Sequence, residues 1–120
     1  MDKTLLVTGG TGSFGNAVVK KFLKSNTFSE IRILSRDESK QDRMAKDYNS
    51  NKLSFYLGDV RDKERIKSVC KGVDVIFHAA ALKIVPSCEN ATWETIKTNI
   101  FGSKNVIEAA IYNKVKNLTL

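Results

Sequence analysis

The sequence predicts an α/β fold in which helices cover both faces of a parallel β-sheet. Short apolar segments of strand length alternate with segments of helical periodicity, and most of the apolar segments are near-continuous. Near-continuous apolar runs are typical of strands buried on both faces, and alternation with helices is typical of βαβ units. Because such crossovers are right-handed in nearly all known proteins, the sequence predicts a doubly wound parallel sheet.

The first two strands and helices are predicted from apolar periodicity. Residues Thr4–Thr8 form an apolar run closed by glycines, which predicts a buried strand. A helix is expected from Ser13 to Ser25, since apolar residues recur there at helical spacing. They are Phe14, Val18, Val19, Phe22 and Leu23. Residues Ile31–Ser35 form the next predicted strand, and Glu38–Asn49 a polar helix with few core contacts.

The middle of the chain repeats this alternation. Leu53–Leu57 is a third predicted strand, and Asp62–Lys71 is a short predicted helix that Gly72 ends. The apolar face of this helix is Ile66, Val69 and Cys70. Val73–Ala80 is the fourth predicted strand.

The last predicted helix is the longest. After a loop with the only proline, Pro86, a helix is expected from Thr92 to Asn113. Its predicted buried stripe is Ile96, Ile100, Ser103, Ile107 and Ala110. Asn117–Leu120 begins a fifth strand, so the sheet is expected to be truncated there, with residues 1–120 forming one domain.

Composition limits the classes of protein that fit. No apolar run approaches the roughly 20 residues that span a bilayer, and Met1-Asp2-Lys3 does not open a signal peptide. We therefore expect a cytoplasmic protein with no membrane partner. Cys70 and Cys88 lack metal-ligand spacing and the chain has one histidine, so no metal site is expected.

The net charge of +7 raises the question of nucleic-acid binding. The lysines and arginines are spread over several segments among acidic residues, a pattern that argues against a nucleic-acid partner. A basic surface also attracts small phosphate-rich ligands.

A glycine-rich segment supplies a candidate phosphate site. Gly10, Gly12 and Gly15 form a G-x-G-x-x-G pattern directly between a predicted strand and a predicted helix. In Rossmann-type folds this pattern allows a tight turn, a close approach to a pyrophosphate and close helix packing. The predicted cofactor-binding residues here are Gly9, Gly10, Thr11, Gly12, Ser13, Phe14 and Gly15. The alternative is a glycine-rich turn that binds no ligand.

The end of the second strand predicts which dinucleotide is bound. NAD-binding folds place an acidic residue there to accept from the ribose 2′-hydroxyl. This chain has Ser35-Arg36-Asp37, and a hydroxyl beside a guanidinium suits a 2′-phosphate, so NADP is predicted. Lys40 adds charge near the same phosphate. The alternative is that Arg36 is a solvated charge and Asp37 the ribose acceptor of an NAD enzyme.

The ends of the third and fourth strands complete the predicted site. Asp59 is expected to accept from the adenine amino group and Val60 to cover the ring, although Asp59 could equally be a helix cap or turn residue. Ala79 and Ala80 leave room for a flat cofactor, and Lys83 follows at the ligand-binding edge. His78 fits a structural histidine better than a catalytic one.

Five segments together resemble the extended short-chain dehydrogenase/reductase family. They are TGGTGSFG, SRDESKQ, GDVRD, HAAALKIVPSCE and TIKTNIFGSKNVIEAA, and the resemblance extends over essentially the whole chain. Within that family they are most similar to the inverting UDP-N-acetylglucosamine 4,6-dehydratases of bacterial capsule and lipopolysaccharide biosynthesis. The resemblance implies a UDP-sugar substrate, a homo-oligomer and an NADP that takes a hydride from C4 before water is lost across C5 and C6.

The resemblance also implies roles for individual residues. Lys83, Thr98 and Asn99 would lie on the substrate and nicotinamide side, while the acid/base residues would lie beyond Leu120, with no catalytic residue in this chain. The substrate domain would be absent too. The alternatives are a UDP-sugar 4-epimerase of the same family and a non-catalytic dinucleotide-binding module.

Overall fold

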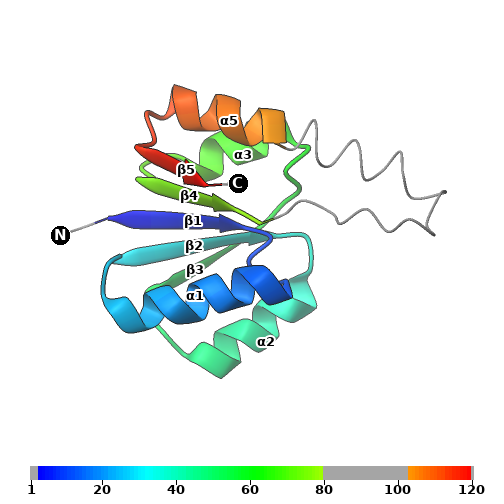
Figure 1. The fold of residues 1–120 in the computed structure, drawn as a ribbon. Helices are drawn as coiled ribbons and strands as arrows, with labels where there is room; N and C mark the ends of the chain where they lie inside the picture. Colours follow the sequence, from blue (N-terminus) through cyan, green and yellow to red (C-terminus); the bar gives the residue numbers. More distant parts are fainter. Residues whose placement is uncertain (1–2, 80–102, 120) are drawn as a thin grey trace, which may run out of the picture.

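The described part of the chain folds into a parallel sheet with two helices on each face (Figure 1). The computed structural model describes residues 3–79 and 103–119. In sheet order the strands are β3 (Leu53–Leu57), β2 (Glu30–Ser35), β1 (Thr4–Thr8), β4 (Val75–His78) and β5 (Asn117–Thr119). The helices are α1 (Ser13–Ser25), α2 (Glu38–Tyr48), α3 (Lys63–Val69) and α5 (Ser103–Tyr112). The predicted doubly wound α/β fold is confirmed.

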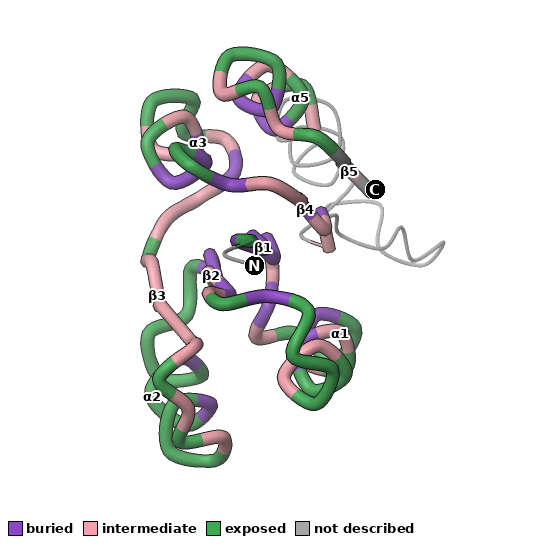
Figure 2. The backbone as a smooth tube through the Cα atoms, turned by 90° about the vertical axis from the view of Figure 1, so that its left-hand side faces the viewer, coloured by how far each residue is buried: buried purple, intermediate pink, exposed green. Residues whose placement is uncertain are grey.

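β1 lies at the centre of the sheet and divides the apolar core into two parts. All five of its residues are buried, and it pairs with β2 on one side and β4 on the other. Leu5 and Val7 pack with Val19 of α1 and Met44 of α2, whereas Leu6 packs on the opposite face. Figure 2 shows the buried backbone concentrated in β1 and β2, with exposed outer surfaces on the helices.

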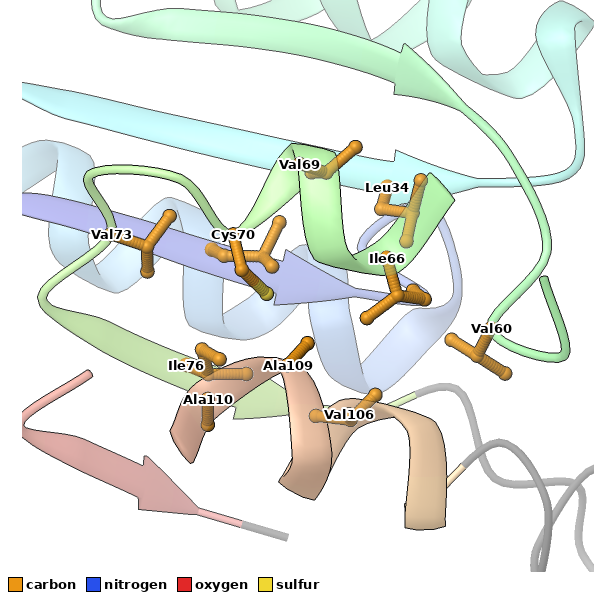
Figure 3. Close-up of a cluster of buried hydrophobic side chains, with 11 residues drawn as sticks. Leu34, Val60, Ile66, Val69, Cys70, Val73, Ile76, Val106, Ala109 and Ala110 are labelled. Carbon is orange, nitrogen blue, oxygen red and sulfur yellow. The ribbon is translucent and has the colours of Figure 1, made fainter. Parts of the chain in front are cut away.

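The second core lies between the sheet and the pair α3 and α5 (Figure 3). Its buried members are Leu6, Leu34, Val60, Ile66, Val69, Cys70, Val73, Ile76, Val106, Ala109 and Ala110. Burial raises the pKa of the Cys70 thiol to about 11, against a smaller opposing effect of the Arg32 charge. Cys70 is therefore a protonated core residue.

Side chains on neighbouring elements hold the ends of α3. The Asp62 carboxylate caps its N-terminus by accepting from the backbone N–H of Arg65 at 3.2 Å. At its C-terminal end, Arg32 Nη1 donates to the carbonyl of Val69, the last residue of the helix, and to that of Lys71, at 2.8 and 2.6 Å. Arg32 comes from β2, so this contact ties the helix to the sheet.

Two asparagines fasten α5 to the segments beside it. Asn105 Nδ2 donates to the carbonyls of Val60 and Arg61, both at 3.0 Å. Asn113 Nδ2 donates to the carbonyl of Lys67 in α3 at 3.1 Å. We refer to the first pair of contacts as the Asn105 bridge.

Several predicted boundaries were wrong by one or two residues. The fourth strand is Val75–His78 rather than Val73–Ala80, because the Val73 N–H bonds the Cys70 carbonyl in the turn after α3. The second helix ends at Tyr48, where Asn49 adopts the left-handed conformation (φ 43°). Ala80 and the first part of the predicted helix from Thr92 lie outside the described residues.

Two predicted core positions were also wrong. Phe14 is 65% exposed, since the first turn of α1 lies at the sheet edge, where its ring contacts Phe77. In α5 the buried residues are Val106, Ala109 and Ala110, while Ile107 is exposed, because small alanines let this helix approach α3 closely. Within residues 3–79 and 103–119, no helix is long and apolar enough to cross a membrane.

Candidate nucleotide-binding site

A cavity of about 700 Å³ opens at the carboxyl edge of the sheet. This is the edge, on both sides of β1, where open α/β sheets bind ligands. Predicted residues that line the cavity are Gly9, Thr11, Gly12, Ser35, Arg36, Asp37, Lys40, Asp59, Val60 and Ala79. Its volume lies within the range of about 300–1,000 Å³ that is usual for small-molecule sites.

The glycines between β1 and α1 differ in how much room a side chain would have at each position. A Cβ on Gly15 would lie 2.5 Å from the Gly9 carbonyl oxygen, and one on Gly10 would lie 2.7 Å from Ile33 Cγ2. Packing of the fold therefore requires both to be glycine. A Cβ on Gly12 would make only an ordinary contact, 3.4 Å from the Gly9 oxygen. The fold itself does not require glycine there, and the open space faces the cavity.

The N-terminus of α1 is suited to an anion. Gly12 is the N-cap and offers no side chain to the first-turn N–H groups, and that turn holds no acidic residue. The partial positive charge of the helix end is thus uncompensated by side chains of the turn. By contrast, α2 is capped by the Asp37 carboxylate, which accepts from the Lys40 N–H at 3.0 Å.

The end of β2 carries the predicted ribose-side residues. The Ser35 hydroxyl oxygen accepts from Gln41 Nε2 at 2.9 Å, which fixes the side chain and leaves its hydrogen available for donation. Arg36 is 55% exposed and lines the cavity with Lys40. Since one oxygen of Asp37 caps α2, Asp37 serves the helix end, which weakens its assignment as a ribose acceptor.

Asp59 lies at the end of β3 and is bound by arginines. The Arg61 guanidinium donates from Nε and Nη2, with Nη2 at 2.8 Å from Asp59 Oδ2. These hydrogen bonds hold the pKa of Asp59 below its ordinary value, with burial acting in the opposite direction. Arg36 Nη1 is 3.7 Å from the same oxygen. The cap of α3 is Asp62, so the helix-cap alternative for Asp59 was wrong. The turn alternative is confirmed, because the Arg61 N–H donates to Asp59 Oδ1 at 2.9 Å and the Asp62 N–H donates to the Asp59 carbonyl at 2.9 Å.

His78 is buried behind the glycine turn. Its Nδ1 shares a hydrogen bond of 2.5 Å with Thr8 Oγ1, and its Nε2 one of 3.2 Å with Ser103 Oγ. Desolvation lowers its pKa from the ordinary 6.5. It links β1, β4 and α5 and does not line the cavity. The structure therefore places it as a structural histidine.

Not every predicted site residue lies on the cavity wall. Gly10, Ser13, Phe14 and Gly15 do not line it, and Ala80, Lys83, Thr98 and Asn99 lie outside the described residues. Sequence reasoning missed Leu34 and Gly58, which line the cavity beside predicted residues. The resemblance placed the whole range 35–40 at the adenosine end, and Glu38 and Ser39 of that range line the cavity too. Sequence reasoning also missed Arg61, whose spacing of two residues from Asp59 was the available signal. Among the described residues no group of His, Cys, Asp and Glu could hold a metal.

A glycine turn, an uncapped helix N-terminus and polar side chains at one edge of a parallel sheet define a Rossmann-type α/β protein. The chain belongs to the family described as "Polysaccharide biosynthesis protein", whose model matches residues 5–120.

Several known proteins have similar sequences or structures, and a UDP-glucose 4-epimerase is among them. The chain is 58% identical over 118 residues to a UDP-glucose 4-epimerase of Rickettsia prowazekii (strain Madrid E), across 96% of this chain and 35% of that one. Pen from Bacillus thuringiensis is 37% identical with a TM-score of 0.91, across 98% of this chain and 36% of that one. The chain thus spans about a third of these relatives' length.

A second solved structure carries a dinucleotide. It is DesIV, a dTDP-glucose 4,6-dehydratase from Streptomyces venezuelae, with NAD and TYD bound. It is 26% identical with a TM-score of 0.84, and the match covers 96% of this chain and 38% of that one.

Proposed function

We propose that this chain is the dinucleotide-binding portion of a nucleotide-sugar enzyme, and that it binds NADP. The observation that carries the proposal is the cavity at the carboxyl edge, where Gly12 leaves space beside an uncapped helix end and Arg36 and Lys40 supply positive charge. The relatives' names support the nucleotide-sugar class, and the NAD bound to DesIV supports a nicotinamide dinucleotide.

The residues of the cavity divide by the part of the dinucleotide that each would hold. The N-terminus of α1 and Gly12 would hold the pyrophosphate, Ser35, Arg36 and Lys40 the 2′-phosphate, and Asp59 and Val60 the adenine. The chemistry that such a cofactor supplies when bound is acceptance and return of a hydride at the sugar. The chain's own contribution is binding and orientation.

Replacing Arg36 tests the choice of NADP. Arg36→Ala removes a charge-assisted contact, which should weaken NADP binding by about 1.5–3 kcal/mol while leaving NAD affinity nearly unchanged. Titration calorimetry of both dinucleotides measures this. The matched control is Arg43→Ala, an exposed arginine of α2 away from the cavity. Equal loss of NADP and NAD affinity, or no loss, contradicts the assignment.

We propose UDP-N-acetylglucosamine 4,6-dehydration as the activity of the complete enzyme, on the resemblance of SRDESKQ and ALKIVPSCE. A second candidate is UDP-sugar 4-epimerisation, which the name of the 58% identical relative favours. Both activities begin with oxidation at C4. Incubation of the complete gene product with UDP-N-acetylglucosamine and with UDP-glucose distinguishes them, because dehydration yields a 4-keto-6-deoxy sugar and epimerisation yields the C4 epimer.

A further inference from the structure

Two arginine side chains meet around one carboxylate, that of Asp59, at the adenosine side of the cavity. Arg61 engages both oxygens of Asp59, with Nε at 3.2 Å from Oδ1 and 3.1 Å from Oδ2, and Nη2 at 2.8 Å from Oδ2. The backbone N–H of Arg61 also donates to Oδ1 at 2.9 Å. Arg36 Nη1 lies 3.7 Å from Oδ2, beyond hydrogen-bond distance.

These distances show that Asp59 pairs much more closely with Arg61 than with Arg36. Asp59 is paired in a forked geometry with Arg61 and retains only a long ion pair with Arg36. A forked arginine–carboxylate pair is both stronger and more directional than a single long contact. The Arg36 side chain, which is partly exposed and lines the cavity, is therefore held by Asp59 far less tightly than Arg61 is.

Asp59 and a ribose phosphate would compete for Arg36. An unneutralised carboxylate 3.7 Å from the Arg36 guanidinium would draw that side chain toward itself and would also repel a phosphate bound there. Both effects disfavour a phosphorylated ribose and leave an unphosphorylated ribose unaffected. Neutralising the Asp59 charge removes the attraction of Arg36 and the repulsion of the phosphate.

We propose that Arg61 is a positioning residue that sets the preference for a 2′-phosphorylated adenosine ribose, by neutralising Asp59 and so releasing Arg36. This inference rests on the proposed function, because it concerns the same cavity. It adds a residue that does not itself line the cavity and that acts through the Asp59 carboxylate, which does.

The test compares NADP and NAD binding to wild type and Arg61→Leu by titration calorimetry. We expect the dissociation constant of NADP to rise about threefold to tenfold and that of NAD to change by less than about twofold, as the loss of one partly exposed charge pair would give. The matched control is Arg65→Leu, which removes the same charge from a residue that bonds the Leu57 carbonyl and stacks near Tyr56. The ratio of its NADP affinity to its NAD affinity should equal that of wild type.

A double-variant cycle separates this role from a structural one. Asp59→Asn keeps an oxygen acceptor for the adenine amino group but removes the charge, so in that background Arg61→Leu should no longer change the ratio. Should Arg61→Leu fail to fold by circular dichroism, Arg61→Lys retains the positive charge without the fork, and its ratio should lie below that of wild type.

The two proposals fail in different ways. A wild-type chain that binds neither dinucleotide overturns the proposed function. This inference alone is overturned if the wild-type chain binds NADP but both Arg61 variants keep the wild-type ratio of NADP affinity to NAD affinity. It is also overturned if Arg61→Leu lowers that ratio equally in the wild-type and the Asp59→Asn backgrounds.

Discussion

Gly12 and Gly15 belong to the same turn but are glycine for different physical reasons. A Cβ at Gly15 would overlap the Gly9 and Gly10 backbone, whereas one at Gly12 has ordinary room. The G-x-G-x-x-G pattern predicted the turn from the sequence alone. Which glycine serves packing and which leaves space for a ligand became clear only from the distances.

Replacing each glycine separates folding from binding. Gly12→Val should leave a folded chain, destabilised by about 1 kcal/mol at most for the changed N-cap, and should abolish dinucleotide binding by filling the space beside the helix end. Gly15→Ala should lose the fold. Circular dichroism and titration calorimetry measure the two effects, and retained binding in Gly12→Val would contradict the pyrophosphate assignment.

His78 makes stability depend on pH. The unfolded chain protonates this histidine near pH 6.5, whereas burial lowers the pKa in the folded chain. The unfolded state therefore binds more protons as pH falls below about 6.5, and the free energy of unfolding should decrease there. Because the chain has a single histidine, its Cε1 proton resonance reports the folded pKa directly. A pKa of His78 at or above 6.5 in the folded chain would contradict the burial of this side chain.

Some site residues could not be found from sequence patterns. Asp59 was predicted because it ends a strand, but its pairing with Arg61 depends on a turn whose geometry no periodicity encodes. Phe14 fits both the apolar stripe and the glycine motif, yet it lies at the edge of the sheet and is mostly exposed. Hydrophobic patterns predict which face of a helix or strand is apolar. Whether a residue near the end of that element is buried depends on where the end lies in the fold.

At the scale of elements, α3 depends on a residue from the sheet. With seven residues it is too short to be stable by itself, and Arg32 bonds the carbonyls at its C-terminal end. Arg32→Leu should lower the free energy of unfolding by about 1.5–3 kcal/mol, the usual range for hydrogen bonds from a charged group. Urea unfolding measures the change. Arg43→Ala, on the exposed face of α2, should show almost none.

The types of element were predictable and their ends were not. Apolar runs and helical spacing located every described strand and helix, since burial against a sheet imposes those periods. The ends depend on local bonds such as the left-handed Asn49 after α2 and the turn from Cys70 to Val73. In α5 the larger apolar residue Ile107 is exposed, whereas the small residues Ala109 and Ala110 are buried on the face that packs against α3.

At the scale of the whole molecule, the described part of the cavity shows no evident acid/base group positioned for catalysis. Two of its carboxylates are engaged, Asp59 with Arg61 and Asp37 with the N-terminus of α2, and the third, Glu38, lies in the first turn of α2. We expect the 120-residue polypeptide to bind dinucleotide and to convert no UDP-sugar, because general acid/base catalysis contributes about 10²–10⁴-fold and needs a positioned group. Product chromatography after incubation with UDP-N-acetylglucosamine measures this. Steady turnover by the purified chain would mean that the catalytic residues are misplaced.

The Asn105 bridge gives helix α5 a connection to the ligand. Through Asn105 the helix holds the carbonyls of Val60 and Arg61, the residues that follow Asp59 in the loop after β3. A ligand that orders this loop favours the conformations in which the bridge is intact, and by thermodynamic reciprocity an intact bridge favours the ligand. On the proposed function, occupancy at the adenosine side and attachment of α5 to the opposite face of the sheet from α1 are therefore coupled equilibria, joined through two backbone carbonyls.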